Sequence, residues 1–191
     1  MVQQAEMTAR ARLLDAAARL FYSDGIAATG INAITADAGV ARMSLYNNFA
    51  SKEELMLAYL EARHQEWLEL YRARVRESAD AKAGVLAVFD AYIDHAELGY
   101  EHGFRGCGLL NAAAELPVGS PGRDAVRRHK EQVESILTEH LQALTTPERA
   151  TQLAGHCALL LEGGMARAGL EGQPARIEQA KQIAAELVDA L

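Results

Sequence analysis

Residues 31–49 read INAITADAGVARMSLYNNF, which is two short segments of helical hydrophobic spacing on either side of Gly39. Ile34 and Ala38 share one face of the first segment, and Leu45 and Phe49 share the inner face of the second. Glycine readily adopts the left-handed backbone that a tight turn between two helices needs. The stretch therefore predicts a helix-turn-helix, with short helices at about 31–37 and 41–48.

The rest of the chain also follows a helical period, and no stretch alternates as a strand would. Local signals mark several helix starts: Ser51–Glu54 reads as a capping box, and Ser120-Pro121 and Thr146-Pro147 each place proline after a capping residue. The sequence predicts an all-α fold of about nine helices, at about 7–23, 31–37, 41–48, 52–77, 80–101, 107–115, 121–144, 147–169 and 175–191.

Charge is distributed unevenly along the 191 residues, whose formal net charge is −7. Residues 1–52 carry five basic and four acidic groups, a net +1, whereas residues 53–191 carry 14 basic and 22 acidic groups, a net −8. Only the first segment is suited to approach a polyanion. No apolar run is long enough to span a membrane and residues 1–12 lack a signal-peptide core, so we expect a cytoplasmic protein without a membrane partner.

The outward residues of the second short helix carry the chemistry of DNA recognition. Arg42 suits a guanine edge, Asn47 suits an adenine edge, and the hydroxyls of Ser44 and Tyr46 suit phosphate oxygens. Lys52, at the start of the next helix, adds a phosphate contact. Helical spacing alone predicts this role weakly, because amphipathic helix pairs with a glycine turn are common in helical proteins.

The order of residues around this segment adds a family resemblance. From residue 12 to 56, the run Leu13-Leu14-Asp15-Ala16-Ala17 with Leu20-Phe21, Gly25, Ala28-Thr29, Ile34, Ala38-Gly39-Val40, Leu45-Tyr46, Phe49 and Ser51-Lys52-Glu53-Glu54-Leu55 resembles the head of the TetR family of regulators. The tract Arg105–Glu115, RGCGLLNAAAE, looks like one found in a subset of such regulators, while the rest of residues 57–191 matches more weakly.

The resemblance implies an N-terminal three-helix DNA-binding head, at 1–50, and a helical ligand-binding and dimerisation body, at 51–191. Such regulators are homodimers, usually repressors, that bind a palindromic operator in double-stranded DNA and leave it when a small molecule binds the body. Carried over by position, the residues expected at bases are Asn32, Arg42, Met43 and Asn47, and those expected at phosphates are Thr29, Ser44, Tyr46, Asn48 and Lys52. Ala41 stands where a serine cap is frequent, and Met43 where glycine is frequent.

The body offers a second, less specific set of candidates. A pocket for an apolar or amphipathic inducer of unknown identity is expected among aromatic and polar residues, namely Trp67, Tyr71, Phe89, Tyr92, Phe104, Cys107, Asn111, His156 and Leu160. Each of these side chains also has a plain packing interpretation. The last two helices, about 147–169 and 175–191, are the expected dimer contacts, because the latter carries a narrow apolar seam and Gly163-Gly164 permits close helix approach.

The sequence carries no catalytic constellation, metal motif or phosphate-binding loop, so we expect neither an enzyme nor a cofactor. The two cysteines, Cys107 and Cys157, are expected to be buried thiols, although a redox role for Cys107 stays open. Two alternatives also stay open: activation instead of repression, and a small-molecule or redox sensor with weak or lost DNA binding.

Overall fold

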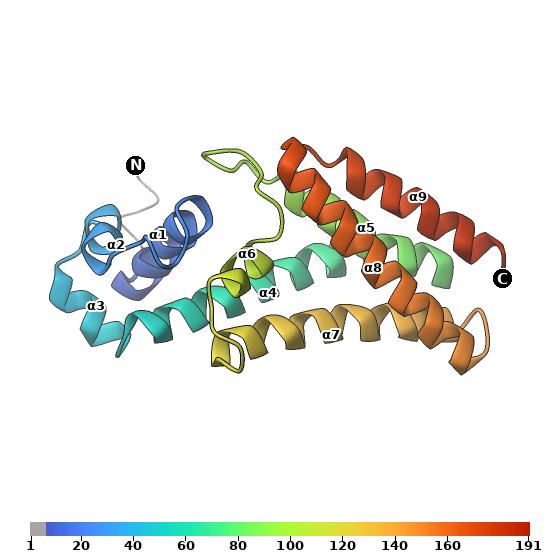
Figure 1. Ribbon diagram of the computed structural model, residues 1–191, viewed down its shortest axis with the longest axis horizontal. Coiled ribbons are helices and arrows are strands. Elements are labelled where there is room, and N and C mark those ends of the chain that lie inside the picture. The colour runs from blue at the N-terminus through green and yellow to red at the C-terminus, as the bar shows by residue number, and fades with distance from the viewer. Residues whose placement is uncertain (1–6) are drawn as a thin grey trace. The chain divides into compact units, whose positions relative to one another are not determined.

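In the computed structural model, which describes residues 7–191, the chain forms nine helices and no strand. Figure 1 labels the helices, which are α1 (Ala9–Ser23), α2 (Ile31–Asp37), α3 (Arg42–Asn48), α4 (Lys52–Arg76), α5 (Ala81–Glu97), α6 (Gly108–Ala114), α7 (Pro121–Gln142), α8 (Pro147–Glu171) and α9 (Ala175–Asp189). The predicted all-α class is confirmed. Across residues 7–191, no helix combines the length and the apolar character that a membrane crossing requires.

Short-range capping explains where most of these helices begin. The Ser51 hydroxyl accepts from the Glu54 N–H at 3.1 Å, and the Glu54 carboxylate accepts from the Ala50 N–H at 2.6 Å, so the predicted capping box is present. The Thr146 hydroxyl caps α8 with a contact of 3.4 Å from the Arg149 N–H. These contacts satisfy N–H groups that have no partner inside the helix.

The predicted extent of α5 is wrong at its carboxyl end. The helix ends at Glu97, whereas its apolar spacing predicted a helix to about residue 101. Leu98 leaves the helical region with φ −57° and ψ 130°, and Gly103 then adopts a φ of +79°. The apolar spacing continues past the residue at which the backbone turns, so periodicity alone does not mark this end.

The chain divides into two units. The first contains the chain up to Arg63 together with Gly108–Val126, and the second contains His64–Cys107 together with Arg127–Leu191. Both α4 and α7 therefore contribute to each unit. The boundary expected after residue 50 is a division by role, and it stays a prediction.

The core of the first unit joins α1 to the two short helices. Side chains that are at most 4% exposed come from each of them and from the residue that ends α3: Leu13, Ala17 and Phe21, Ile34, Leu45 and Phe49. Figure 1 shows α1, α2 and α3 gathered together. Because α2 and α3 have only seven residues each, they depend on this shared burial for their stability.

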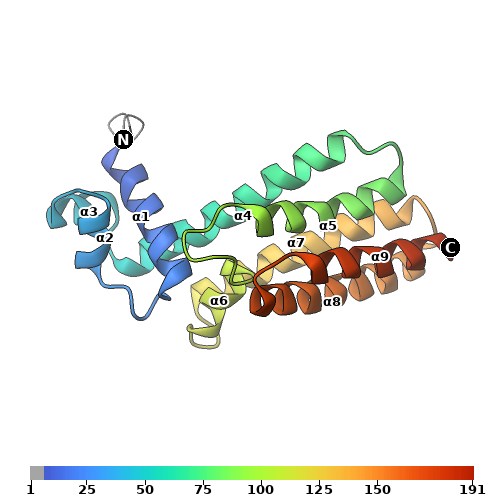
Figure 2. The same ribbon diagram turned by 90° about the horizontal axis from the view of Figure 1, so that it is seen from above.

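The second unit contains α5, α8, α9 and the adjoining parts of α4 and α7. Figures 1 and 2 both show α8 and α9 side by side, joined by a turn at Gly172, whose φ is +70°. Gly164 makes the close approach possible, because a Cβ there would lie 3.3 Å from the Ala180 Cβ. Lys181 of α9 pairs with Asp90 of α5 at 2.6 Å, which ties a third helix to this pair.

Histidines of the second unit form hydrogen bonds within its interior. The Nδ1 atoms of His64 and His129 lie 2.8 Å apart, so one ring donates and the other accepts. His140 bonds the Tyr71 hydroxyl at 2.7 Å. Burial, together with the charge of Lys130 and the neighbouring histidines, lowers the pKa of His129 to about 2, and burial lowers the pKa of His140 as well. His129 therefore stays neutral in the folded chain.

This neutrality predicts an acid-sensitive fold. Below the pKa of an unfolded histidine, about 6.5, the unfolded chain binds a proton that folded His129 refuses, so its stabilising effect is present above that pH and is lost as the pH falls. The expected slope in the free energy of unfolding is up to about 1.4 kcal/mol per pH unit for this one group. Urea unfolding of His129→Gln between pH 7 and pH 5 is expected to show a shallower loss than the unmodified chain.

The exposed His156 supplies the control, because His156→Gln removes a histidine from the surface. An unchanged slope in His129→Gln, or an equal change in both variants, would contradict this account.

Candidate nucleic-acid interface

The turn between α2 and α3 is held by both its own backbone and α1. Gly39 has a φ of +60°, and the Val40 N–H donates to the Thr35 carbonyl at 3.0 Å. The Arg12 guanidinium donates to the Gly39 carbonyl at 2.8 Å. A Cβ at Gly39 would lie 2.6 Å from that guanidinium, so both the backbone angle and the space require glycine. Sequence analysis predicted the glycine and missed the arginine.

A second arginine of α1 holds the end of α2. Arg19 bonds Asp37 at 2.6 Å and also pairs with Asp15, one turn away on its own helix. These hydrogen bonds and charges outweigh the effect of burial and raise the pKa of the guanidinium. Arg10 lies over the Phe49 ring, 4.6 Å from its centroid. Three basic groups counted as head charge thus have contacts within the head itself.

Helix α3 turns a single row of side chains outward. Leu45 is fully buried, whereas Arg42, Met43, Tyr46 and Asn47 are exposed, with Met43 at 67% and Tyr46 at 42%. Arg42 makes no ion pair with any residue between 7 and 191. The structure therefore brings together the four expected contacts that need free side chains on this helix.

The remaining residues of α3 lie at its edge. Ser44 and Asn48 are half-buried, and the Asn48 amide donates to the Ser44 carbonyl at 2.7 Å. Ala41 is the N-cap and supplies no side-chain hydrogen bond, as its sequence position predicted. The missing cap leaves the start of α3 dependent on packing for its order.

Two of the expected phosphate contacts have internal partners. Thr29 is 3% exposed, and its hydroxyl donates to the Gly25 carbonyl at 2.7 Å. The Lys52 ammonium donates to the Ile26 carbonyl at 2.5 Å. Asn32, in contrast, is exposed in the first turn of α2. The structure thus uses Thr29 and Lys52 to hold the segment that joins α1 to α2.

The same segment has a third partner that sequence analysis did not single out. The Glu115 carboxylate, just after α6, accepts from the Ile26 N–H at 3.0 Å and from the Ala27 N–H at 2.7 Å. The only sequence signal was its place at the end of the tract Arg105–Glu115. No local pattern could have paired it with residues so far away in the chain.

The second unit holds an aromatic cluster made of several expected ligand contacts. Trp67 stacks on Tyr71 with ring centroids 5.7 Å apart and lies 5.2 Å from the Tyr92 ring. The Lys130 ammonium lies 5.4 Å from the Tyr92 centroid and pairs with Glu162 at 2.8 Å. The Trp67 indole nitrogen is buried without a hydrogen-bond partner among the residues that the structure describes.

Other expected ligand contacts differ in exposure. Phe89 is fully buried, and Phe104 and Cys107 are 6% and 7% exposed. Leu160 is half-buried, whereas Asn111 and His156 lie on the surface. Both cysteines are free thiols. Within residues 7–191, no three side chains of histidine, cysteine, aspartate or glutamate are grouped so as to hold a metal ion.

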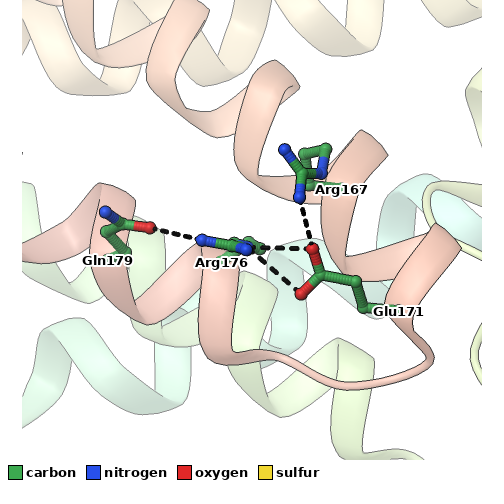
Figure 3. A network of polar contacts seen from close by, with 4 residues as sticks. All are labelled: Arg167, Glu171, Arg176 and Gln179. Carbon is green, nitrogen blue, oxygen red and sulfur yellow. Dashed lines mark hydrogen bonds and ion pairs between the residues drawn. The ribbon is translucent and has the colours of Figure 1, made fainter.

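A polar network fixes the turn between α8 and α9 (Figure 3). Glu171 accepts from Arg167 at 2.7 Å and from Arg176 at 3.0 and 3.1 Å, and Arg176 also donates to Gln179 at 3.1 Å. Hydrogen bonds from the two guanidiniums lower the pKa of this carboxyl. The network links the end of one helix to the start of the next.

Known proteins resemble this chain at both its head and its whole length. The family described as "Bacterial regulatory proteins, tetR family" matches residues 13–59. The transcriptional activator FasR of Mycolicibacterium smegmatis is 37% identical over 95 residues, which are 48% of this chain and 43% of the activator. The repressor KstR2 of Mycobacterium tuberculosis is 38% identical over 77 residues, 40% of this chain and 36% of the repressor. These matches thus span less than half of either curated relative.

A solved structure extends the likeness to the body. The crystal structure of a TetR-family transcriptional regulator from Streptomyces coelicolor is 34% identical in sequence, with a TM-score of 0.84. The similarity covers 94% of this chain and 93% of that one. The helix-turn-helix, the helical body and this full-length similarity agree, and the chain belongs to the TetR family of regulatory proteins.

Proposed function

We propose that the chain is a transcriptional regulator that binds a palindromic operator as a homodimer, through α3 in the major groove, and leaves it when a small apolar or amphipathic ligand binds the body. The single observation that carries this proposal is the outward row of α3, exposed while Leu45 on the opposite face is fully buried. A helix that is anchored on one face and free on the other is the element that a helix-turn-helix inserts between base pairs and protein core. The protein would act in the cytoplasm, where its DNA target lies.

Each exposed residue of α3 has a distinct role in this proposal. Arg42 and Asn47 would read guanine and adenine edges, and Met43 would contact a thymine methyl group. Tyr46, with Ser44 and Asn48 at the edge of the helix, would contact phosphates. Asn32 would reach the same groove from the start of α2.

The internal contacts of Thr29 and Lys52 refine their proposed roles. Because the Thr29 hydroxyl proton is directed at backbone carbonyls, we assign this residue to shaping the loop before α2. An ammonium group has three protons and Lys52 directs one at Ile26, so the other two can bind a phosphate.

The supposed dimer contact follows from an apolar face on α8. Leu159 and Leu170 are 73% and 84% exposed, and Gly163 and Ala166 lie between them on the same helical face. Ile183 of α9 is a further exposed apolar side chain, at 39%. Large exposed apolar side chains in one row mark an interaction surface, and we infer that a second copy of the chain covers it.

The ligand site is proposed in the aromatic cluster around Trp67. Stacked rings, a buried indole N–H without a partner and the Lys130–Glu162 pair combine apolar surface with a few polar groups. We propose no catalytic role, because the relatives that the chain resembles are named as regulators of transcription. The functional boundary near residue 50 would separate reading of DNA from sensing and dimerisation.

One observation favours the alternative of a sensor with weak DNA binding. Arg12, Arg19 and Lys52 all contact groups within the head, so little positive charge is left to neutralise phosphates. Phosphate neutralisation supplies a large share of DNA affinity and makes it depend on salt. The strength of specific binding therefore decides between the two functions.

Footprinting on the DNA that flanks the chain's own gene tests the proposal. We expect protection of a palindrome whose half-sites are about 34 Å apart centre to centre, one turn of the duplex. Affinity should fall as salt rises, while selectivity over random duplex persists. Equal, salt-sensitive binding to every duplex, or no binding, would favour the sensor.

Arg42→Ala is expected to weaken operator binding by about 1–3 kcal/mol, roughly 5- to 150-fold, because a bidentate contact to a base is lost. Fluorescence anisotropy with labelled operator measures the change. Arg72→Ala removes one exposed cation from α4 and is the matched control. The assigned role of Arg42 fails if the two variants lose the same affinity.

Leu159→Glu together with Leu170→Glu is expected to convert the dimer into a monomer, because charge is placed on the surface that two copies would bury. Sedimentation velocity measures the change. Val118→Glu is the control, since Val118 is 89% exposed in the segment between α6 and α7. A double variant that remains dimeric would show that α8 does not form the dimer contact.

A further inference from the structure

Glu115 joins α6 to the segment between α1 and α2 through two charge-assisted hydrogen bonds. One carboxylate oxygen accepts from the Ile26 N–H at 3.0 Å and the other accepts from the Ala27 N–H at 2.7 Å. Both amides follow the end of α1, where the backbone has left the helical ladder. Bonds from a carboxylate to N–H groups are stronger than bonds between neutral groups.

The segment is shaped to receive this carboxylate. Gly25 has a φ of +94°, and a Cβ at this position would lie 2.8 Å from the Glu115 Oε1 atom. Glycine therefore provides both the backbone conformation and the space. From its own helix, Lys52 donates to the carbonyl of Ile26 at 2.5 Å, so the same residue is held through its N–H and its carbonyl.

The position of Glu115 is itself fixed by α6 and its surroundings. The Arg123 guanidinium donates to the carbonyls of Ala113 and Leu116, both at 3.3 Å, on either side of the glutamate. At the other end of α6, a Cβ at Gly108 would lie 3.1 Å from the ring of Tyr22 in α1. Helix α6 thus meets α1 at its start and the segment after α1 at its end.

The chain leads into α6 from a close backbone contact within the second unit. A Cβ at Gly169 of α8 would lie 2.6 Å from the Gly106 nitrogen and 2.7 Å from its Cα. Gly106 precedes the first residue of α6 by two positions. Any movement of α8 must therefore move the residues that enter α6, because backbone atoms in direct contact cannot absorb it.

We propose that Glu115 is a positioning residue that couples α6 to the DNA-binding head, so that a displacement of α6 changes the orientation of α2 and α3. The proposal rests on the proposed function, because it concerns how that function is regulated. Hydrogen bonds at 2.7 and 3.0 Å are lost with a shift of about 1 Å. A small movement of α6 is therefore sufficient either to pull the segment at Ile26 and Ala27 or to release it.

The first part of the test compares Glu115→Ala and Glu115→Gln with the unmodified chain. Glu69→Gln, an exposed glutamate of α4, is the matched control. Operator affinity is expected to fall about tenfold in Glu115→Ala and less in Glu115→Gln, which keeps one acceptor oxygen. Affinity for random duplex should not change, because Glu115 has no proposed contact with DNA. An unchanged operator affinity in Glu115→Ala would overturn the proposal.

The second part measures the coupling without DNA. Amide hydrogen exchange at Ile26 and Ala27 is compared in the unmodified chain, Gly169→Ala, Glu115→Ala and the double variant. Gly169→Ala is expected to accelerate exchange of the two amides in the unmodified chain, by displacing the residues that enter α6. The same substitution should add nothing once Glu115 is alanine, which is the non-additivity of a coupled pair.

The outcomes separate the coupling from the proposed function. Additive effects on exchange, or no effect of Gly169→Ala at these amides, would show that Glu115 only caps a turn and would overturn the proposal. If the unmodified chain selects no operator, the proposed function fails, and the exchange measurements still decide whether α6 is coupled to the head. Glu115→Gln keeps the test valid if Glu115→Ala does not fold.

Discussion

The turn from Ala38 to Ala41 is the constraint on which the proposed DNA interface depends. Its left-handed Gly39 sets the direction of α3, and the Arg12 guanidinium holds the Gly39 carbonyl from α1. Burial of Leu45 then determines which face of α3 points outward. With only seven residues, α3 cannot hold this direction by its own hydrogen bonds, so its readiness to bind comes from α1 and the turn.

This use of α1 changes the meaning of the head's charge. Sequence counting gave residues 1–52 a net charge of +1, which suggested a weakly basic surface for DNA. In the structure, Arg12, Arg19 and Lys52 are directed at carbonyls and carboxylates of the head, and Arg42 is the cation that α3 presents. Specific contacts from α3 would therefore carry more of the affinity than general attraction to phosphates.

The sequence predicted features that depend on near neighbours. The starts of α4 and α8 follow from Ser51 and Thr146, and the turn follows from Gly39, because each signal acts within a few residues. The end of α5 was predicted too late, since apolar spacing continues beyond Glu97 while the backbone does not.

Contacts between distant parts of the chain were beyond such reasoning. Arg12 is 27 residues from Gly39, and Glu115 is 89 residues from Ile26, so only the folded chain brings these groups together. The exposed face of α3 could be predicted because Leu45 and Phe49 define its buried side. In the body, Asn111 and His156 were expected near the aromatic residues but lie on the surface, because helical spacing does not say which polar residue of a helix turns inward.

The central claim is that α3 reads bases in the major groove, and guanine methylation interference tests it most directly. The N7 atom of guanine lies in that groove and is the partner expected for Arg42. The account predicts that N7 methylation within each half-site blocks binding and that Arg42→Ala loses sensitivity at one of these guanines. Selective binding that is indifferent to N7 methylation throughout guanine-containing half-sites would contradict it.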